Sequence, residues 1–597
     1  MIANYNDIFG YITAQEAAFR LPVRINEKWD WSFKDHVLTT ELYTNSQLLN
    51  GKSEFTPVKN ITRPILNLQH RTEDIELKDV QIYVDDADKY HLSFLVKKYH
   101  DDVFVQENDL DTFFDELNAS RIDFGGGFSK KISKGREVVP LQSIAFCDQT
   151  DMLSGPIGLK HFFSPDQLLE MADKGWGDEK NGATISLDNL ILLSKEEKKE
   201  ERIDDITQTP GRYIEIYEVH GNLPKRFSDK SYTGEAYETR IYICAFYQEK
   251  SSDERQGVIL YTAPEKKSPF KLIKKDSVYG RALGFGGIEE LFEAQVWVNY
   301  DMIRMQDMLD AASKTILGAI GNNSASIATR NNISNMKNLE ILDLGDSDLK
   351  QIDTFPRNIK LFENSIAQWE AHAQQMGAAN DSIMGQPPTA GTPFKLQELV
   401  TAESHGLHDY RRGQFAKHIE EIYRDDYIPE IQKKITQGAR FLSELSIDEL
   451  NYVLEGLVVS QTNKMKIKYV LDNGGEAPPP ETVEAFEQLV RSDFKKKGNK
   501  HFIEILKGEF KDAPLAVKVT VKGKSKDLAA RTDKLVNVFR QIIANPAVLQ
   551  IPALGKIFND ILESSGLNPA DFSGITKEQI AATQPTPSPI QPVPVTA

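Results

Sequence analysis

A stretch of about 30 residues without proline or glycine, Ile288–Leu317, constrains the fold more than any other feature of the chain. Its apolar residues recur every three to four positions, which predicts an amphipathic helix roughly 45 Å long. A second helix is predicted over Pro356–Gln375, because proline is favoured in the first turn of a helix. A third stretch, Phe394–Ala439, would reach roughly 60 Å if continuous, although Pro429 can kink it. Helices average three to four turns, so one of that length must run through or beside a large assembly.

Glycine, asparagine and proline interrupt these helices twice. The first interruption, Gly318–Phe355, begins with a Gly/Asn/Ser-rich stretch and contains a short β-like stretch, Leu339–Leu344. The second, Gly377–Pro393, contains three glycines and three prolines, a composition that excludes regular secondary structure. The order of helix, small β element, helix, irregular loop and very long helix favours a scaffold over a catalytic domain.

The remaining sequence predicts further helices and a β-rich region. Helical spacing of apolar residues is found in Asp7–Arg20, Trp29–Leu49, Asn60–Asp79 and Asp85–Asn118, with Trp29, Trp31 and Phe33 as expected core residues. From Arg121 short β-branched and aromatic runs predict antiparallel strands in Ile122–Phe128, Glu137–Phe146, Tyr213–His220, Thr239–Phe246 and Gly257–Thr262. A capped helix is expected over Gln167–Ala172, an exposed strand over Leu515–Val521, a helix over Ala529–Ala544 and a disordered Pro-rich tail over 576–597. The predicted fold class is therefore α+β and mainly helical.

Composition excludes several classes of protein. The chain has 71 Lys and Arg against 88 Asp and Glu, a formal net charge of −17, whereas a protein that grips nucleic acid through its phosphates is normally basic. Only two cysteines occur, Cys147 and Cys244, so a disulfide framework is excluded and a reducing compartment is expected. The sequence shows no secretory signal and no apolar run long enough to span a membrane.

No catalytic motif is complete. Two Gly-Lys-Ser triplets lack the upstream glycine of a phosphate-binding loop. Asp123-Phe124-Gly125 matches a kinase triplet without its companion motifs, so a β-hairpin turn is the preferred interpretation, and Gly284–Gly287 is interpreted as a flexible entry to a helix. His405 and His408 can share a helix face but lack the other ligands of a metal motif, which favours surface or helix–helix hydrogen bonding. The sequence therefore predicts no enzyme, no cofactor and no metal site.

The order of these segments resembles a known family. GGIEELFEAQVWVNYDMIRMQDML is similar to the first stem helix of the portal proteins of tailed bacteriophages, and PPTAGTPFKLQELVTAESHGLHDYRRGQFAKHIEEIY is similar to their tunnel loop and the long helix after it. NITRPILNLQHRTEDIELKDVQIYVDD and RTDKLVNVFRQIIANP resemble portals of the crAss-like phage group. The resemblance spans most of the chain and is strongest over residues 280–440.

The resemblance implies a portal-type fold assembled as a ring, typically a dodecamer. Its parts would be a wing (1–285, β-rich from about 121), a first stem helix (286–317), a clip (318–355), a second stem helix (356–376), a tunnel loop (377–393), a long wing and tunnel helix (394–440), an upper wing and crown (441–575) and the tail (576–597).

The resemblance also implies where this ring would meet DNA and partner proteins. The tunnel loop would present Asp381, Ser382, Met384, Gln386, Pro387, Pro388 and Thr389 to the DNA channel. The channel-facing stem candidates are Glu289, Glu290, Glu293, Asp301, Asp307 and Asp310. The clip residues expected to contact the terminase or adaptor are Asn322, Asn323, Arg330, Asn331, Asn332, Asp343 and Asp346.

The implied function is a DNA conduit at a unique capsid vertex of the virion. Its implied partners are about twelve copies of itself, the terminase large subunit, the major capsid protein, scaffold, head–tail adaptor proteins and double-stranded DNA that passes through the channel without sequence specificity. It would assemble in the host bacterial cytoplasm without a membrane. Negative charge along such a channel would repel phosphates and keep DNA sliding freely. The alternatives are another virion structural protein, such as a head–tail adaptor, and a DNA-processing enzyme, which the missing motifs disfavour.

Overall fold

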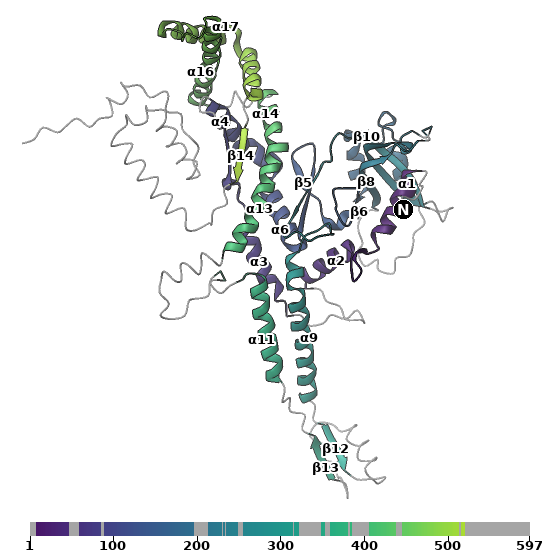
Figure 1. The fold of residues 1–597 in the computed structure, drawn as a ribbon. Coiled ribbons are helices and arrows are strands. Elements are labelled where there is room, and N and C mark those ends of the chain that lie inside the picture. The colour runs from purple at the N-terminus through teal and green to yellow at the C-terminus, as the bar shows by residue number, and fades with distance from the viewer. Residues whose placement is uncertain are drawn as a thin grey trace, which may run out of the picture. The chain divides into compact units, whose positions relative to one another are not determined.

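The computed structural model forms two compact units of mixed helix and sheet, in agreement with the predicted α+β class (Figure 1). Unit 1 takes its residues from 1–71, 119–128 and 139–405, and unit 2 from 72–118, 129–138 and 406–597. The residues described are 7–46, 59–84, 89–195, 213–229, 231–232, 234–248, 255–313, 316–320, 348–352, 359–379, 383–384, 405–437, 445–512 and 515–519.

Unit 1 is built around a five-stranded antiparallel sheet. Its strand order is β10-β9-β8-β7-β6, formed by β6 (Ile144–Phe146), β7 (Ile157–Phe163), β8 (Ile214–Pro224), β9 (Tyr237–Gln248) and β10 (Arg255–Pro264). The other elements of the N-terminal half of this unit are α1 (Ile8–Phe19), β1 (Val23–Asn26), β2 (Trp29–Trp31), α2 (Phe33–Thr44), α3 (Thr62–Thr72), α7 (Pro165–Glu170), α8 (Leu187–Lys195) and β11 (Phe270–Lys274).

Both faces of this sheet are buried, which explains why strand β9 is continuously apolar from Ile241 to Tyr247. Along β9 the side chains alternate: Tyr242 and Cys244 enter the hydrophobic core that α1 covers. Ile243 and Ala245 enter a second core that contains residues of α7 and α8. A strand that faces solvent on one side would instead alternate apolar with polar residues.

A buried histidine network crosses β8. The ring of His220 contacts Glu218 through Nε2 at 3.0 Å and Glu265 through Nδ1 at 3.0 Å, and His161 contacts the other oxygen of Glu218 at 3.1 Å. Since ionised carboxylates only accept hydrogen bonds, His220 makes both of its bonds only as the doubly protonated imidazolium. Burial alone would lower the pKa of His220, but the hydrogen bonds and charges of Glu218 and Glu265 outweigh it and raise the pKa above 6.5.

The two glycine clusters of the sequence form one close backbone contact. A Cβ on Gly125 would lie 2.4 Å from the carbonyl oxygen of Gly284, and a Cβ on Gly286 would lie 2.6 Å from that of Asp123. The Gly284 amide donates to the Gly125 carbonyl at 3.1 Å. These glycines are therefore needed for packing: they bring the turn between α6 (Leu110–Phe124) and β4 (Gly126–Lys131) against the segment that starts the next long helix.

That long helix belongs to a helix–strand–strand–helix arrangement. It consists of α9 (Gly287–Ser313), β12 (Ile316–Ile320), β13 (Asp348–Ile352) and α11 (Ile359–Met376). The two strands pair antiparallel, with Ile316 opposite Ile352 and Ile320 opposite Asp348. Figure 1 shows the two helices side by side, and they pack along each other. The two predicted helices are confirmed, and the strands described between them lie at other residues than the predicted β element, Leu339–Leu344.

Unit 2 is mainly helical. Its elements are β3 (Val80–Val84), α4 (Tyr90–Tyr99), a π-helical turn (His100–Phe104), α5 (Val105–Asn108), most of α6, the end of β4, β5 (Arg136–Val138), α13 (Gly406–Ile422), a second π-helical turn (Tyr423–Tyr427), α14 (Ile428–Gln437), α16 (Ile447–Asp472), α17 (Pro480–Asp512) and β14 (Leu515–Val519). The two π-helical turns contact each other through aromatic rings, and His100 Nε2 lies 2.8 Å from the Tyr423 hydroxyl. In the second turn Asp426 accepts hydrogen bonds from Lys131 and the buried Arg136.

Several predicted element boundaries are wrong. Residues Trp29–Trp31 form strand β2 before a helix that starts only at Phe33, and Trp29 is 38% exposed instead of being a core residue. The helix predicted over Ile288–Leu317 ends at Ser313, so Leu317 lies in β12. The predicted strand at Ile122–Phe128 is the end of α6 followed by β4, so Asp123-Phe124-Gly125 is a helix-to-strand turn and not a hairpin.

The long-helix prediction is confirmed from Gly406 to Gln437, interrupted by the π-helical turn that precedes Pro429. Leu515–Val519 pairs with β3. Strands β7 and β11 were not predicted. The predicted segments Leu339–Leu344 and Ala529–Ala544, together with the tail 576–597, lie outside the described residues.

Replacing Gly125 by alanine should lower the free energy of unfolding of unit 1 by about 2–4 kcal/mol, because φ is +79° there and the Gly284 carbonyl occupies the Cβ position. Gly155→Ala is the matched control: its Cβ would meet only an ordinary contact at 3.7 Å, so a change within about 0.5 kcal/mol is expected. Urea unfolding of the full chain measures both, and equal effects would contradict the packing role of Gly125.

His220→Gln should remove a pH-dependent part of the stability of unit 1. Because the pKa of His220 is raised on folding, the imidazolium stabilises the folded state below about pH 6.5, and this contribution disappears as the pH rises through the raised value. The variant should lose about 1.5–3 kcal/mol at low pH and less at about pH 9. Urea unfolding of both proteins at several pH values measures this, and a pH-independent difference would contradict it.

Candidate functional site

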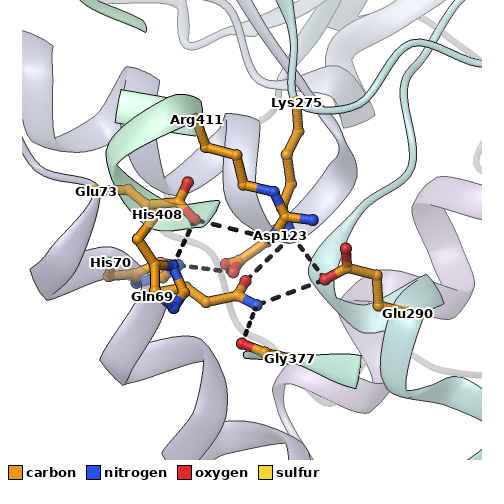
Figure 2. A network of polar contacts seen from close by, with 9 residues as sticks. All are labelled: Gln69, His70, Glu73, Asp123, Lys275, Glu290, Gly377, His408 and Arg411. Atoms are coloured by element: carbon orange, nitrogen blue, oxygen red, sulfur yellow. Dashed lines mark hydrogen bonds and ion pairs between the residues drawn. The ribbon is translucent and has the colours of Figure 1, made fainter. Parts of the chain in front are cut away.

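The candidate functional site is the α9–α11 pair, and a buried polar cluster lies at its base. Lys275 follows β11, and its side chain is 0% exposed. Its Nζ lies 2.9 Å from Oε2 of Glu290, in the first turn of α9, and 3.1 Å from Oε1 of Gln69 on α3. The amide nitrogen of Gln69 donates to Glu290 at 3.4 Å and to the Gly377 carbonyl at 3.3 Å, and Figure 2 shows this arrangement. The cluster therefore ties the start of α9 and the end of α11 to the same helix, α3.

A second buried cation fixes the same end of α9. Arg281 is 1% exposed, and its guanidinium forms two 2.7 Å bonds to the carboxylate of Glu289. Its Nε and Nη2 also donate to the Leu283 and Gly284 carbonyls. This bidentate geometry is the strong form of a charge-assisted hydrogen bond, so the first turn of α9 is held by two ion pairs.

Further along, α9 and α11 run antiparallel through specific contacts. The rings of Trp297 and Trp369 stack with centroids 6.1 Å apart, and the Ser365 hydroxyl donates to Asp301 at 2.6 Å. Four residues further along α9, from Trp297 to Asp301, the partner on α11 lies four residues earlier, at Ser365. The two helices therefore run antiparallel. Apolar side chains of α3, α9 and α11 form one core between the helices.

The pair also exposes large apolar side chains that the described parts of the chain leave uncovered. On α9 these are Phe292, Val296, Trp297, Tyr300, Ile303 and Leu309, and on α11 they include Leu361 and Met376. Large apolar side chains exposed together on one helix pair are candidates for contact with another protein surface.

The predicted channel-facing acids divide into two groups. Glu289, Glu290 and Asp301 are used inside the protomer, in the contacts described above, and Glu290 is only 6% exposed. Glu293, Asp307 and Asp310 are exposed on α9. Exposure to solvent favours a channel-facing role for the second group, and the role stays a prediction for all six residues.

Most of the other predicted site residues fall outside the described part of the chain. Of the tunnel-loop candidates the structure describes Met384, which is 40% exposed, while Asp381, Ser382, Gln386, Pro387, Pro388 and Thr389 lie outside it. All the clip candidates, Asn322, Asn323, Arg330, Asn331, Asn332, Asp343 and Asp346, also lie outside it.

The histidine pair considered for metal binding has a structural partner. In unit 2, Nδ1 of His408 lies 3.0 Å from Oε1 of Glu73, with both side chains fully buried, so the hydrogen-bonding interpretation is confirmed for His408. In unit 1, the Asp123 carboxylate of the kinase-like triplet contacts His70 at 2.8 Å (Figure 2). Within the described residues no group of three His, Cys, Asp or Glu side chains is arranged to hold a metal ion, and no helix is long and apolar enough to cross a membrane.

Gln69, Lys275 and Arg281 are functional-site residues that no sequence motif marks. Gln69 and Lys275 contact each other across 206 residues, whereas Arg281 pairs with Glu289 only 8 residues away. Neither a polar residue on an amphipathic helix nor a lysine or arginine after a strand is a motif. The glycines at 284–287 were the only available signal, since a close backbone approach leaves little room for solvent around neighbouring side chains.

No protein-family model and no curated protein matches the chain. Among solved structures, one chain of an assembly described as "Neck of native GTA particle computed with C12 symmetry" is 10% identical with a TM-score of 0.32, covering 94% of this chain and 100% of that one. A chain described as "Neck of empty GTA particle computed with C6 symmetry" is 9% identical with a TM-score of 0.28, covering 93% of this chain and 98% of that one. One from "Virion of native gene transfer agent (GTA) particle" is 10% identical with a TM-score of 0.27, covering 74% and 96%. Likeness at this level does not establish a common fold or function.

Lys275→Met should lower the free energy of unfolding by about 3–5 kcal/mol, because it leaves the carboxylate of Glu290 buried and unpaired. The double variant Lys275→Met/Glu290→Met should recover most of this loss, since an apolar pair needs no counter-charge. Lys274→Met is the control on the neighbouring lysine, whose Nζ donates to the Arg281 carbonyl, and about 1 kcal/mol is expected. Equal losses for the single and double variants in urea unfolding would contradict the ion pair's role.

Proposed function

We propose that the protein is a phage portal protein, which forms a ring at one capsid vertex and serves as a channel for DNA packaging and ejection. The observation that supports this most directly is the α9–α11 pair: two long antiparallel helices that lead to and from a β-strand pair and that expose large apolar side chains. In the proposed ring the two helices are the stem, and the segment between them is the clip that meets the terminase and later the head–tail adaptors.

The exposed apolar side chains give a physical reason for a ring. Burial of these side chains against a neighbouring subunit would stabilise the assembly by roughly 25 cal/mol for every Å² of apolar surface that is covered. A neighbouring subunit related by rotation presents a different face of its own helix pair to that surface, and heterologous contacts of this kind close into a ring when the rotation divides a full turn. The proposed ring of about twelve subunits satisfies that condition and leaves a central channel.

Charge supports a channel that does not hold DNA tightly. Twelve copies at −17 each would carry about −200 formal charges, and a field of this sign repels phosphates. On α9 the exposed acids Glu293, Asp307 and Asp310 outnumber the exposed cation Arg304. A conduit of this kind needs no catalytic group, and we propose that the protein has no enzymatic activity of its own.

Native mass spectrometry of the purified full chain, with two-dimensional class averages of the same sample, tests this function. We expect closed rings of about twelve subunits with a central hole. A monomer or dimer at every concentration, or a particle without a hole, would overturn the proposal.

A double variant, Ile303→Asp and Leu309→Asp, should abolish the ring and leave the protomer folded. Both side chains are exposed in the protomer, at 37% and 46%, so substitution should change its stability by about 0.5 kcal/mol or less. At a subunit contact an unpaired buried carboxylate costs several kcal/mol per copy. Leu192→Asp on α8, where the side chain is 58% exposed, is the matched control and should still form rings. Native mass spectrometry measures both, and intact rings from the double variant would contradict the subunit contact.

A further inference from the structure

The chain turns back sharply where α11 ends. The Gly377 amide donates to the Ala373 carbonyl at 2.9 Å, and the Ala379 amide donates to the Gln374 carbonyl at 2.8 Å. Between them Ala378 has a φ of +52°, in the left-handed region that alanine rarely adopts. A non-glycine residue persists in this conformation only when surrounding contacts impose it.

Helix α3 supplies those contacts. A Cβ on Gly377 would lie 2.3 Å from Cγ2 of Ile65, so the backbone at this point is pressed against α3. After the turn, Ala379 is 1% exposed and Ile383 is 6% exposed, and both enter the core that contains Ile65. The chain that leaves α11 is therefore docked on α3 through apolar contacts on two sides of the turn.

Gln69 adds a polar contact from α3 to this turn. Its side chain is fully buried, and its amide nitrogen donates to both the Gly377 carbonyl and the Glu290 carboxylate. Its amide oxygen accepts from Lys275. Only a primary amide offers two donors and an acceptor at one position, so glutamate or leucine cannot replace this set of bonds.

We propose that Gln69 is a positioning residue for the segment that starts at Gly377. It sets the point and direction at which the chain leaves α11, and it links that exit point to the ion pair between Lys275 and Glu290 at the start of α9. The functional meaning of this link rests on the proposed function, in which the same segment is the tunnel loop of each subunit. Every subunit of the ring would then begin its loop at a position defined by α3.

The contacts that support this role are made within unit 1 by described residues: Ile65, Gln69, Lys275, Glu290, Gly377, Ala379 and Ile383. Loss of the Gln69 amide should loosen the turn after α11 before it loosens α9, because the ion pair between Lys275 and Glu290 remains when the amide is removed.

Hydrogen exchange of the full chain, followed by mass spectrometry, tests the proposal. In Gln69→Leu, peptides covering residues 373–384 should exchange about ten-fold faster, because the Gly377 carbonyl loses its donor from α3 and the turn opens more often. Peptides from α9 and from β9 should exchange at the wild-type rate. Asn67→Leu, an exposed position on the same helix, is the matched control and should leave all three regions unchanged.

Gln69→Glu is a second variant, which keeps the proposal testable if Gln69→Leu does not fold. It keeps the size of the side chain but places a second carboxylate beside Glu290 and the Gly377 carbonyl, so it should also accelerate exchange at residues 373–384. Wild-type exchange at 373–384 in both variants, or equal acceleration throughout unit 1, would overturn the positioning role.

The ring mass, measured on the same samples, separates this inference from the proposed function. Rings in Gln69→Leu with faster exchange at 373–384 support both. Absence of rings in the wild type with faster exchange in the variant supports the positioning role of Gln69 and overturns the portal function.

Discussion

A lysine ammonium and a glutamate carboxylate buried together at the start of α9 set the arrangement on which the rest of unit 1 depends. Removing both charges from water is expensive, and the cost is recovered only when Lys275 and Glu290 meet in one geometry with their remaining donors and acceptors satisfied. A shift of α9 by one residue would rotate Glu290 by about 100° and break the pair. The register of the helix against β11 and α3 is thus specified by electrostatics as well as by packing.

The glycines make that geometry possible. Gly284 and Gly286 lie against the backbone of the turn at residues 123–125, and a Cβ on Gly287 would meet Leu66 of α3 at 2.5 Å. Larger residues would push the first turn of α9 away from α3 and separate Glu290 from its partners. Backbone contact and ion pair therefore support each other, and Arg281 with Glu289 adds a second fixed point on the same turn.

Sequence periodicity predicted where many of the helices and strands lie, but not which residues contact one another in the folded protein. The helices α1, α9 and α11 and the strands β8, β9 and β10 follow from local apolar spacing, which is why they could be predicted. Strand β7 has Lys160 and His161 in its middle, so these polar residues obscured the apolar pattern. Gln69 and Lys275 are 206 residues apart, and Gln69 and Gly377 are 308 apart, so no local pattern could place them together. The glycine clusters were noticed but interpreted as a hairpin turn and a flexible entry, because their mutual contact is a property of the tertiary structure.

The acidic residues of α9 have different roles at the two ends of the helix. Glu289 and Glu290 are neutralised by buried cations, so they contribute to folding and hardly to the external field. Asp307 lies 17 residues further along, roughly 26 Å by helix geometry, and remains exposed. A formal count of negative charge on this helix therefore overstates what passing DNA would meet near its first turn, and the repulsion expected of a conduit is concentrated toward the end that leads to β12. In the proposed ring, folding and DNA repulsion are thus assigned to separate parts of one helix, and neither constrains the residues that serve the other.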